Sequence, residues 1–441
     1  MEAAVPVELE IGFAAESLSE GSPEEKAAFG LFTIQSSHGS LTEGWDHFLD
    51  GSRLGPLVSA YHAAEWFAWN WWRLRWEPRR STEQWQFAHN LNAIGEGYAW
   101  PNLTIFSDGE RTALISAPSS DPNAKPFRYF GALPIIVSSR AWEGAVDGFV
   151  GQILARLGAR DVRDSNLRRI WKDILAERED PEIARRRKLE ALLGRDPDEV
   201  EDDRVERLVG EEEELGRSAV EELAADQDGT DGAVLSARQF KAIARASGFE
   251  CDVRDAMRFD PETLPNRDTV PAWRLGTMAA ERLREQERLA WDRISDHRLV
   301  AMAGCSKEVL ARNKEANQTM SFSLATKAER GRIVLRSKWK DGRRFELARL
   351  IGDSIFGGQG KLHLATRAYT YGQKAQRSFA AELLCPFKTL DDMLGGDYST
   401  EAQQDAAKYF AVSPMTVNTL LMNHGRIERS DPETSIDAIA A

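Results

Sequence analysis

Arg349 and Asp353 lie four residues apart in residues 343–353, a stretch whose sequence predicts a helix. Side chains at positions i and i+4 meet on one helical face, so these two can form an ion pair. An exposed pair of this kind contributes only about 0.3–0.5 kcal/mol. In a partly closed cleft, the pair would neutralise the pocket or hold a peptide, a carboxylate or a loop. The open alternatives are two relic side chains in a solvated groove, or residual catalysis by another route.

The same spacing suits a catalytic zinc helix, but the residue types do not. In the pattern H-E-x-x-H, two histidines at i and i+4 bind zinc and the glutamate between them acts as general base. Leu350 occupies the glutamate position here, and Arg349 and Asp353 occupy the histidine positions. None of the seven histidines pairs with another at i, i+4. His363 could approach the same cleft, but we predict a surface or core role for it.

The composition limits the class of protein. A chain of 441 residues is long enough for two or three domains. The formal net charge of −13 argues against a polyanion bound over the whole surface, although a local basic patch stays open. Cys251, Cys305 and Cys385 are far apart and form no C-x-x-C pair, so we expect buried free thiols and no cysteine metal site. We expect a cytoplasmic protein, since no segment has ~18 uninterrupted apolar residues.

The first part of the chain is rich in tryptophan. Nine of the thirteen tryptophans lie between Trp45 and Trp142. Several of them fall on a predicted helix that begins near Pro56 and has more aromatic surface than one face can hold. Two interpretations are open, namely packing in the core and against a neighbouring domain, or a groove for a partner. The candidates for partner binding are Trp66, Trp69, Trp72 and Trp76.

Further elements make this first part a mixed α and β unit, assigned to residues 1–158. Residues 103–106 and 112–115 flank Ser-Asp-Gly-Glu and predict a β-hairpin. Residues 135–137 predict another strand. After Ser139, which we assign as the N-cap, apolar residues at three- and four-residue steps up to Leu157 predict an amphipathic helix.

An acidic segment follows, assigned to residues 159–232 as a helical connector and linker. Residues 160–228 contain 14 Lys and Arg against 23 Asp and Glu, with leucines between the charges. This pattern favours helices with a solvated face over a disordered tail. Residues 226–232 contain two glycines and no apolar side chain, so we place a domain boundary there. Beyond it, residues 333–339 alternate as a short strand before the helix of residues 343–353.

Residues 270–427 resemble the ImmA/IrrE family of metallopeptidase-like proteins. The resemblance is carried, in order, by residues 271–276 (Pro-Ala-Trp-Arg-Leu-Gly), by Arg343, Arg344 and Phe345 at the entry to the helix, by residues 379–386 (Phe-Ala-Ala-Glu-Leu-Leu-Cys-Pro) and by residues 409–413 (Tyr-Phe-Ala-Val-Ser). It implies a zincin-like domain, assigned to residues 233–427. The remaining residues 428–441 are assigned as a disordered tail.

The resemblance also implies where zinc ligands would lie. Zinc-binding members use the two histidines of the first helix and a carboxylate about four residues before the Phe of the second helix, which corresponds to Ala375 here. A zinc site needs three protein ligands and an open position for water. Asp353 alone does not provide this, and the guanidinium of Arg349 would repel the cation. We therefore predict no catalytic residues, no metal and no cofactor.

The C-terminal residues predict two helices joined by a tight turn. Thr400 with Gln403 suggests a capping box, and Ser413 followed by Pro414 suggests the start of the second helix. This is a helix-turn-helix pattern, which serves DNA reading or, as in relatives, only the domain structure. The candidates for DNA contact are Thr416, Asn418, Thr419, Asn423 and Arg426. Few cations are present to hold phosphates.

Together these observations predict an α+β, multi-domain protein with a Trp-rich unit, an acidic connector and a zincin-like domain ending in a helix-turn-helix-like pair. The function that we expect is a non-catalytic, ImmA/IrrE-like pseudo-peptidase that binds another protein, in a toxin–antitoxin, stress-response or phage-defence setting implied by the resemblance. The alternatives are a peptidase with a displaced zinc site and a DNA-binding regulator. No membrane partner is expected.

Overall fold

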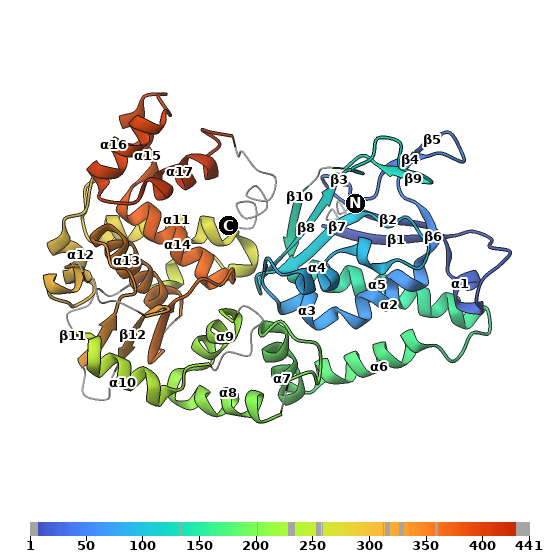
Figure 1. The fold of residues 1–441 in the computed structure, drawn as a ribbon, viewed down its shortest axis with the longest axis horizontal. Coiled ribbons are helices and arrows are strands. Elements are labelled where there is room, and N and C mark those ends of the chain that lie inside the picture. Colours follow the sequence, from blue (N-terminus) through green and yellow to red (C-terminus); the bar gives the residue numbers. More distant parts are fainter. Residues whose placement is uncertain are drawn as a thin grey trace, which may run out of the picture. The chain divides into compact units, whose positions relative to one another are not determined.

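The computed structural model describes residues 8–131, 134–200, 202–227, 234–252, 257, 259–311, 313, 318–325, 330–357 and 360–428. The described chain is a mixture of α-helices and antiparallel β-sheets (Figure 1). It divides into two compact units, residues 1–201 and residues 202–439. The expected α+β class is therefore confirmed at the level of mixed helices and sheets. Among the described residues, none of the helices is both long and apolar enough to cross a bilayer.

The first unit contains three small sheets. One has the order β1-β2-β3, with β6 also paired to β2; the second has the order β10-β8-β7, and the third β5-β4-β9. The bounds of their strands are β1 (Leu9–Ala15), β2 (Phe29–Ser36), β3 (Gly39–Ser40), β4 (Gly44–Asp46), β5 (Gly51–Arg53), β6 (Leu57–Ser59), β7 (Asn102–Ser107), β8 (Arg111–Ala117), β9 (Phe127–Tyr129) and β10 (Pro134–Ser138).

The predicted hairpin is confirmed as β7 and β8, which pair from Asn102 with Ala117 to Ser107 with Thr112. Its turn is held by Asp108, whose Oδ1 accepts the backbone N–H of Glu110 at 3.1 Å and of Arg111 at 2.8 Å. An aspartate that bonds the backbone two and three residues ahead is a standard way to close such a turn.

The helices of the first unit are α1 (Pro23–Ala27), α2 (Ala60–Trp69), α3 (Trp71–Trp76), α4 (Glu83–His89), α5 (Ser139–Ala159), α6 (Asn166–Glu179) and α7 (Pro181–Leu192), with a short 3-10 helix at Leu91–Ile94. The Trp-rich stretch is thus two helices, which meet at Asn70. The N-cap of α5 is Ser138, one residue before the prediction, and its hydroxyl accepts the N–H of Ala141. Ser139 is instead buried and bonds the hydroxyls of Ser107 and Thr112.

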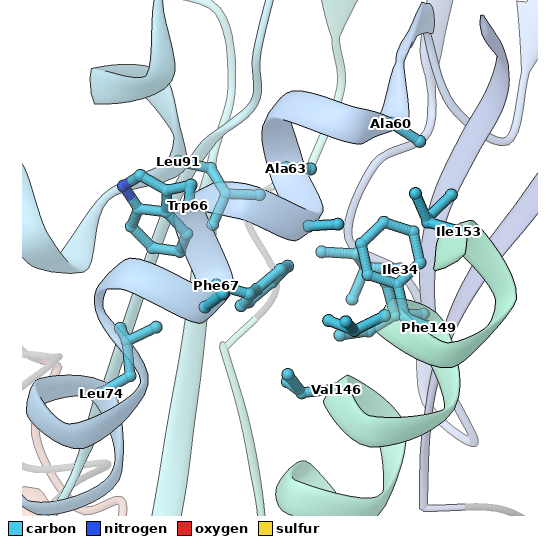
Figure 2. Packing of buried hydrophobic residues seen from close by; sticks show 14 of the residues in the cluster. Ile34, Ala60, Ala63, Trp66, Phe67, Leu74, Leu91, Val146, Phe149 and Ile153 are labelled. Carbon is cyan, nitrogen blue, oxygen red and sulfur yellow. The ribbon is translucent and has the colours of Figure 1, made fainter. Parts of the chain in front are cut away.

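The core of this unit lies between α2, α5 and the strands. Figure 2 shows Phe67 of α2 pointing toward Phe149 of α5, and their ring centroids are 6.1 Å apart. Phe32 of β2 joins them at 5.6 Å from Phe149. The predicted apolar face of α5 is confirmed, because Val146, Phe149 and Ile153 are all buried.

The second unit contains one antiparallel sheet of four strands in the order β11-β13-β12-β14. Its strands are β11 (Phe249–Asp252), β12 (Ser321–Ala325), β13 (Arg330–Val334) and β14 (Leu362–Ala365). Its helices are α8 (Asp202–Leu215), α9 (Arg217–Ala225), α10 (Ala237–Ser247), α11 (Ala272–Gln286), α12 (Asp296–Met302), α13 (Lys340–Phe356), α14 (Tyr371–Leu384), α15 (Phe387–Leu394), α16 (Thr400–Phe410) and α17 (Pro414–Asn423), with 3-10 turns at Pro261–Thr263, Arg267–Thr269 and Lys307–Leu310. The strand predicted at residues 333–339 ends earlier, at Val334, because the backbone N–H groups of Arg336 and Ser337 donate to the side chains of Ser321 and Glu346.

The acidic segment is not a connector of its own, which corrects the predicted three-part division. Helices α6 and α7 belong to the first unit, and α8 and α9 belong to the second. The reason is that the leucines between the charges are core residues, such as Leu167 of α6 and Leu223 of α9. The boundary lies at residues 201 and 202 instead of residues 226–232. Residues 228–233 and 429–441, which include most of the predicted linker and tail, lie outside the described residues.

Helix α14 packs closely against both α11 and α13, because a glycine on each of these two helices leaves room. A Cβ added at Gly276 of α11 would lie 2.3 Å from the backbone oxygen of Ala375 on α14. One added at Gly352 of α13 would lie 2.8 Å from the ring of Phe379 on α14. Close helix packing at glycine therefore sets the position of the side chains that α13 and α14 turn toward each other.

Candidate functional site

The first turn of α13 is anchored by two buried arginines. Arg343 donates to the backbone oxygens of Val309 at 2.8 Å and Ser337 at 3.0 Å. Arg344 donates to the backbone oxygen of Ile294 at 2.8 Å and forms an ion pair with Asp296. These contacts hold the segments on both sides of α12 against α13. Arg343 and Arg344, two of the residues that carry the resemblance, therefore stabilise the fold.

Arg349 is buried one turn further along α13. Its Nη2 donates to the backbone oxygen of Thr366 at 2.8 Å and to Oε1 of Gln373 on α14 at 2.6 Å. Burial, together with the nearby positive charge of Arg377, lowers the pKa of Arg349 to about 9. The predicted ion pair with Asp353 is wrong. The guanidinium donates instead to two neutral acceptors, Gln373 on α14 and the backbone oxygen of Thr366 between β14 and α14. In the described structure its buried Nε has no hydrogen-bond partner.

Asp353 is bound by a different set of partners. Its Oδ2 lies 3.0 Å from Nδ1 of His363 on β14 and accepts the backbone N–H of Leu364 at 3.3 Å. Its Oδ1 accepts Nε2 of Gln376 on α14 at 2.5 Å. We call Arg349, Asp353, His363, Gln373 and Gln376 the α13–α14 polar cluster. The surface or core role predicted for His363 is corrected, since the antiparallel return of β14 along α13 brings it to Asp353.

Leu350 and Ala375, the other two positions compared with those of a zinc site, are apolar and buried. Leu350 is part of the main hydrophobic core of the second unit. Ala375 packs with Ala272 and Leu275 of α11, so the face of α14 that meets α13 carries Gln373 and Gln376 instead. Ala375, which the resemblance implies as the third ligand position, is thus one residue away from Gln376, whose side chain reaches Asp353 of α13.

These residues do not fit a catalytic zinc ion. Zinc takes three protein ligands and leaves a fourth position open. The cluster offers only His363 and Asp353, and they are hydrogen-bonded to each other through Nδ1 and Oδ2. Within the described ranges, no group of three or more His, Cys, Asp or Glu side chains is placed to hold a metal ion.

The Asp353–His363 pair has the geometry that orients an imidazole as a general base. Ser323 is the cross-strand neighbour of His363 in the pairing of β12 with β14. Nucleophilic catalysis would require the Ser323 hydroxyl to hydrogen-bond the imidazole. In the described structure the hydrogen bonds of His363 include none to Ser323. Ser323 is therefore not activated by His363 in the described structure.

Helix α9, from the acidic segment, lies beside this cluster. Both carboxylate oxygens of Glu222 are 2.8 Å from the hydroxyl of Thr370, the N-cap of α14. Asp226, just after α9, accepts the backbone N–H of Arg367 at 2.7 Å. Two acidic residues of this segment thus attach α9 to the segment that runs from β14 into α14.

The proton affinity of Glu222 is altered by this position. Burial raises the pKa of Glu222 to about 8, and the negative charges of Asp353 and Glu221 act in the same direction. The bond to Thr370 and the charge of Arg377 oppose the shift. Because its pKa is raised to about 8, the half-buried carboxyl group of Glu222 retains its proton near neutral pH.

The attachment of α9 should depend on pH through Glu222. The folded pKa lies above the ordinary value of 4.5, so the folded state binds the proton more tightly and the attachment weakens as pH rises from 4.5 to about 8. Beyond the intrinsic pH effect, we expect amide exchange in α9 to be at least about tenfold faster near pH 8.5 than near pH 6. Glu222→Gln should remove this difference, and Glu213→Gln, on exposed α8 surface, should retain it. Equal profiles for wild type and Glu222→Gln would contradict the assignment.

The four tryptophans predicted to bind a partner do not form a common surface. Trp66 and Trp72 are buried, and Nε1 of Trp72 donates to Glu177 at 2.7 Å. Trp76 is covered by the guanidinium of Arg75, whose Cζ lies 3.7 Å from the ring centroid. Only Trp69 of the four is strongly exposed, at 58%. The prediction of a shared groove is wrong for these residues, because α2 and α3 diverge at Asn70 and both turn most of their aromatic rings inward.

A more exposed apolar feature escaped the sequence analysis. Phe48 and Leu49, in the turn between β4 and β5, are 85% and 64% exposed. Asp46 holds this turn, since its Oδ1 accepts the N–H of Phe48 at 2.9 Å and of Leu49 at 3.2 Å, and Oδ2 pairs with Arg53 at 3.2 Å. We call residues 46–53 the Phe48 turn. Its only sequence signal is two apolar residues beside Asp50-Gly51, a turn pair.

The residues predicted to contact DNA are largely used inside the helix pair. Ser413 is confirmed as the N-cap of α17, and the buried Thr416 bonds its hydroxyl at 3.0 Å. Asn418 donates to Gln403 of α16 at 3.2 Å, and Arg426 pairs with Asp391 at 2.6 Å.

Of the remaining candidates, Thr419 and Asn423 are half-buried. The N-cap of α16 is Ser399 and not Thr400, and because Ala402 occupies its N3 position, the predicted capping box is not formed. The helix-turn-helix shape is present, but it offers few unpaired groups for bases or phosphates.

The chain matches no protein-family model, and comparison with curated proteins and with solved structures finds none similar to it.

Proposed function

We propose that the second unit is a non-catalytic, ImmA/IrrE-like pseudo-metallopeptidase and that the protein acts by binding another protein, as a regulator or as a subunit of a complex. The observation that carries this proposal is the state of the α13–α14 polar cluster. Arg349 and Asp353 are each hydrogen-bonded within their own chain, and Leu350 and Ala375 are packed in the core. Residues engaged in this way support the domain, which favours a structural over a catalytic role for the cluster.

The Phe48 turn supports the binding role. Two large apolar side chains are held in water by a turn whose aspartate satisfies three donors. Apolar side chains gathered at an exposed site mark interaction surfaces. Trp69, in the same unit, is a second exposed aromatic of the kind that anchors protein interfaces. A cytoplasmic location and a toxin–antitoxin, stress-response or phage-defence setting are proposed on the resemblance alone.

The non-catalytic part is tested by metal analysis of protein purified without chelator. We expect less than about 0.1 zinc per chain from wild type, because three ligands are absent. A positive control is the triple variant Arg349→His, Asp353→His, Gln376→Glu, which should bind about one zinc. Placing the carboxylate by Ala375→Glu instead of Gln376→Glu should abolish this binding. Stoichiometric zinc in wild type, with zinc-dependent cleavage of a protein substrate, would overturn the proposal.

The binding part is tested by capture from the native host with a tagged chain. A specific partner should co-purify with wild type and fall about tenfold or more with Phe48→Ser combined with Leu49→Ser, since a hot spot contributes about 2 kcal/mol or more. The matched control is Trp339→Ser, which removes a 62% exposed aromatic from the second unit. Equal loss in both variants would show non-specific adhesion, and no partner with any bait would contradict a binding role.

A DNA-binding regulator remains the second candidate, favoured only by the shape of α16 and α17. Gel shifts with the protein's own upstream DNA at increasing salt would test it. Sequence-specific binding that is lost in Thr419→Ala combined with Asn423→Ala would favour this function over the one proposed.

A further inference from the structure

Two cysteines that are distant in sequence face each other in the second unit. Cys251 of β11 and Cys305, which follows α12, are partners in an isolated antiparallel β-bridge. Cys251 is buried and Cys305 is half-buried, and both are free thiols. The third thiol, Cys385, is completely buried in α14's C-cap and has no part in this bridge.

The bridge brings the two thiols within bonding reach. Directly opposed residues of antiparallel strands have Cα atoms about 4.5–5.5 Å apart, which lies within the range of about 4.4–6.8 Å found for disulfides. The side chains of Cys305 and Cys251 already share a hydrogen bond, and this bond together with burial raises the pKa of Cys305. Little backbone movement is therefore needed to join the sulfur atoms.

We propose that Cys251 and Cys305 are a dithiol that closes reversibly to an intramolecular disulfide, with a low-molecular-weight disulfide as oxidant. Cys305 is the more exposed of the two, but its raised pKa means that it loses its proton to solvent only in alkaline solution. Its thiolate then attacks the oxidant, forming a mixed disulfide and releasing one small thiol. The Cys251 thiolate then displaces the second small thiol. The two cysteines lose two protons and two electrons, and the oxidant is reduced to two thiols.

The crosslink would connect two segments that pack near the start of α13. Cys305 lies just before the 3-10 turn Lys307–Leu310, where the backbone oxygen of Val309 accepts Arg343 of α13 at 2.8 Å. Cys251 lies on β11, which pairs with β13 in the sheet. The disulfide therefore links β11, at the edge of the sheet, to the segment whose Val309 backbone oxygen accepts Arg343 of α13. Because it closes a long loop, it should also stabilise the second unit.

Oxidation of the native protein tests this inference. After incubation with oxidised glutathione near pH 8.5, where more thiolate is present, the thiol count of the denatured protein should fall from three to one. Peptide mapping should join residue 251 to residue 305. The midpoint of thermal unfolding of the second unit should rise by roughly 5–15 °C and return with dithiothreitol.

Matched variants separate this pair from the third cysteine. Cys385→Ser should still form the bond, and Cys251→Ser and Cys305→Ser should each lose it and the thermal shift. A bond that includes Cys385, only glutathione adducts, or three unchanged thiols in wild type would overturn the proposal. Mapping of the wild-type protein decides the question even if a variant does not fold.

Discussion

Replacing Glu77 with glutamine is expected to destabilise the first unit by about 3–5 kcal/mol, because it leaves buried cations without their anion. Glu77 is 1% exposed. Its carboxylate accepts Nε of Arg73 at 2.7 Å, pairs with Nε of Arg80 at 3.3 Å and lies 3.0 Å from Nε2 of the buried His89. Burial by itself would raise the pKa of Glu77, but the bond to His89 and the charges of His89 and Arg73 outweigh it, so the pKa is lowered.

Urea unfolding of wild type and variant measures this effect. The matched control is Asp196→Asn, because Asp196 pairs with the same Arg73 at 3.3 Å but has a side chain that is 56% exposed. This substitution should lower the free energy of unfolding by less than about 1 kcal/mol. The lowered pKa of Glu77 means that its contribution is present above pH 4.5 and is lost as pH falls through the folded pKa. The difference between wild type and Glu77→Gln should therefore shrink in acid. Equal costs for both substitutions would contradict the role of burial.

A methyl group at Gly276 is expected to cost the second unit about 3 kcal/mol, at the upper end of what overpacking costs. The added Cβ would lie 2.3 Å from the backbone oxygen of Ala375 and 2.7 Å from the backbone nitrogen of Phe379. Neither atom can rotate away, so α14 must shift as a whole. Gln373 and Gln376 shift with it, which weakens their bonds to Arg349 and Asp353.

The control is the same substitution where there is room. Gly210 lies on the exposed side of α8 with nothing within 4 Å of an added Cβ, so Gly210→Ala should stabilise by about 0.5–1 kcal/mol. Urea unfolding gives both values, and amide exchange in α14 should rise only in Gly276→Ala. A neutral Gly276→Ala would mean that α11 and α14 separate at little cost.

Local features were predictable where neighbouring residues decide them. The β7–β8 hairpin, the apolar face of α5 and the start of α17 at Ser413 and Pro414 follow from turn chemistry, periodicity and capping within a few residues. Errors of a single residue, as at Ser138 and Ser399, arise because the next residue, Ser139 or Thr400, also has a hydroxyl that can cap a helix, and only the packing of the helix selects one.

The candidate site was predictable in what it lacks but not in how it is built. The types of Arg349, Leu350 and Asp353 already exclude a histidine pair on α13. Helical spacing also predicted an ion pair, because i, i+4 neighbours are the nearest partners that a sequence reveals. In the fold, the guanidinium bonds Thr366 and Gln373, and the carboxylate bonds residues of β14 and α14, and no local pattern indicates these partners.

The sequence by itself therefore determined several local elements of this protein, such as the β7–β8 hairpin and α5, and the absence of a metal-ligand pattern on the helix of residues 343–353. The tertiary structure alone decided that α9 is attached beside the polar cluster, that His363 meets Asp353, that Phe48 and not Trp66 faces solvent, and that Cys251 faces Cys305. The physical reason is that capping, turns and periodicity act between neighbours along the chain. Burial and the pairing of polar groups depend on residues that only the packing of distant elements brings together.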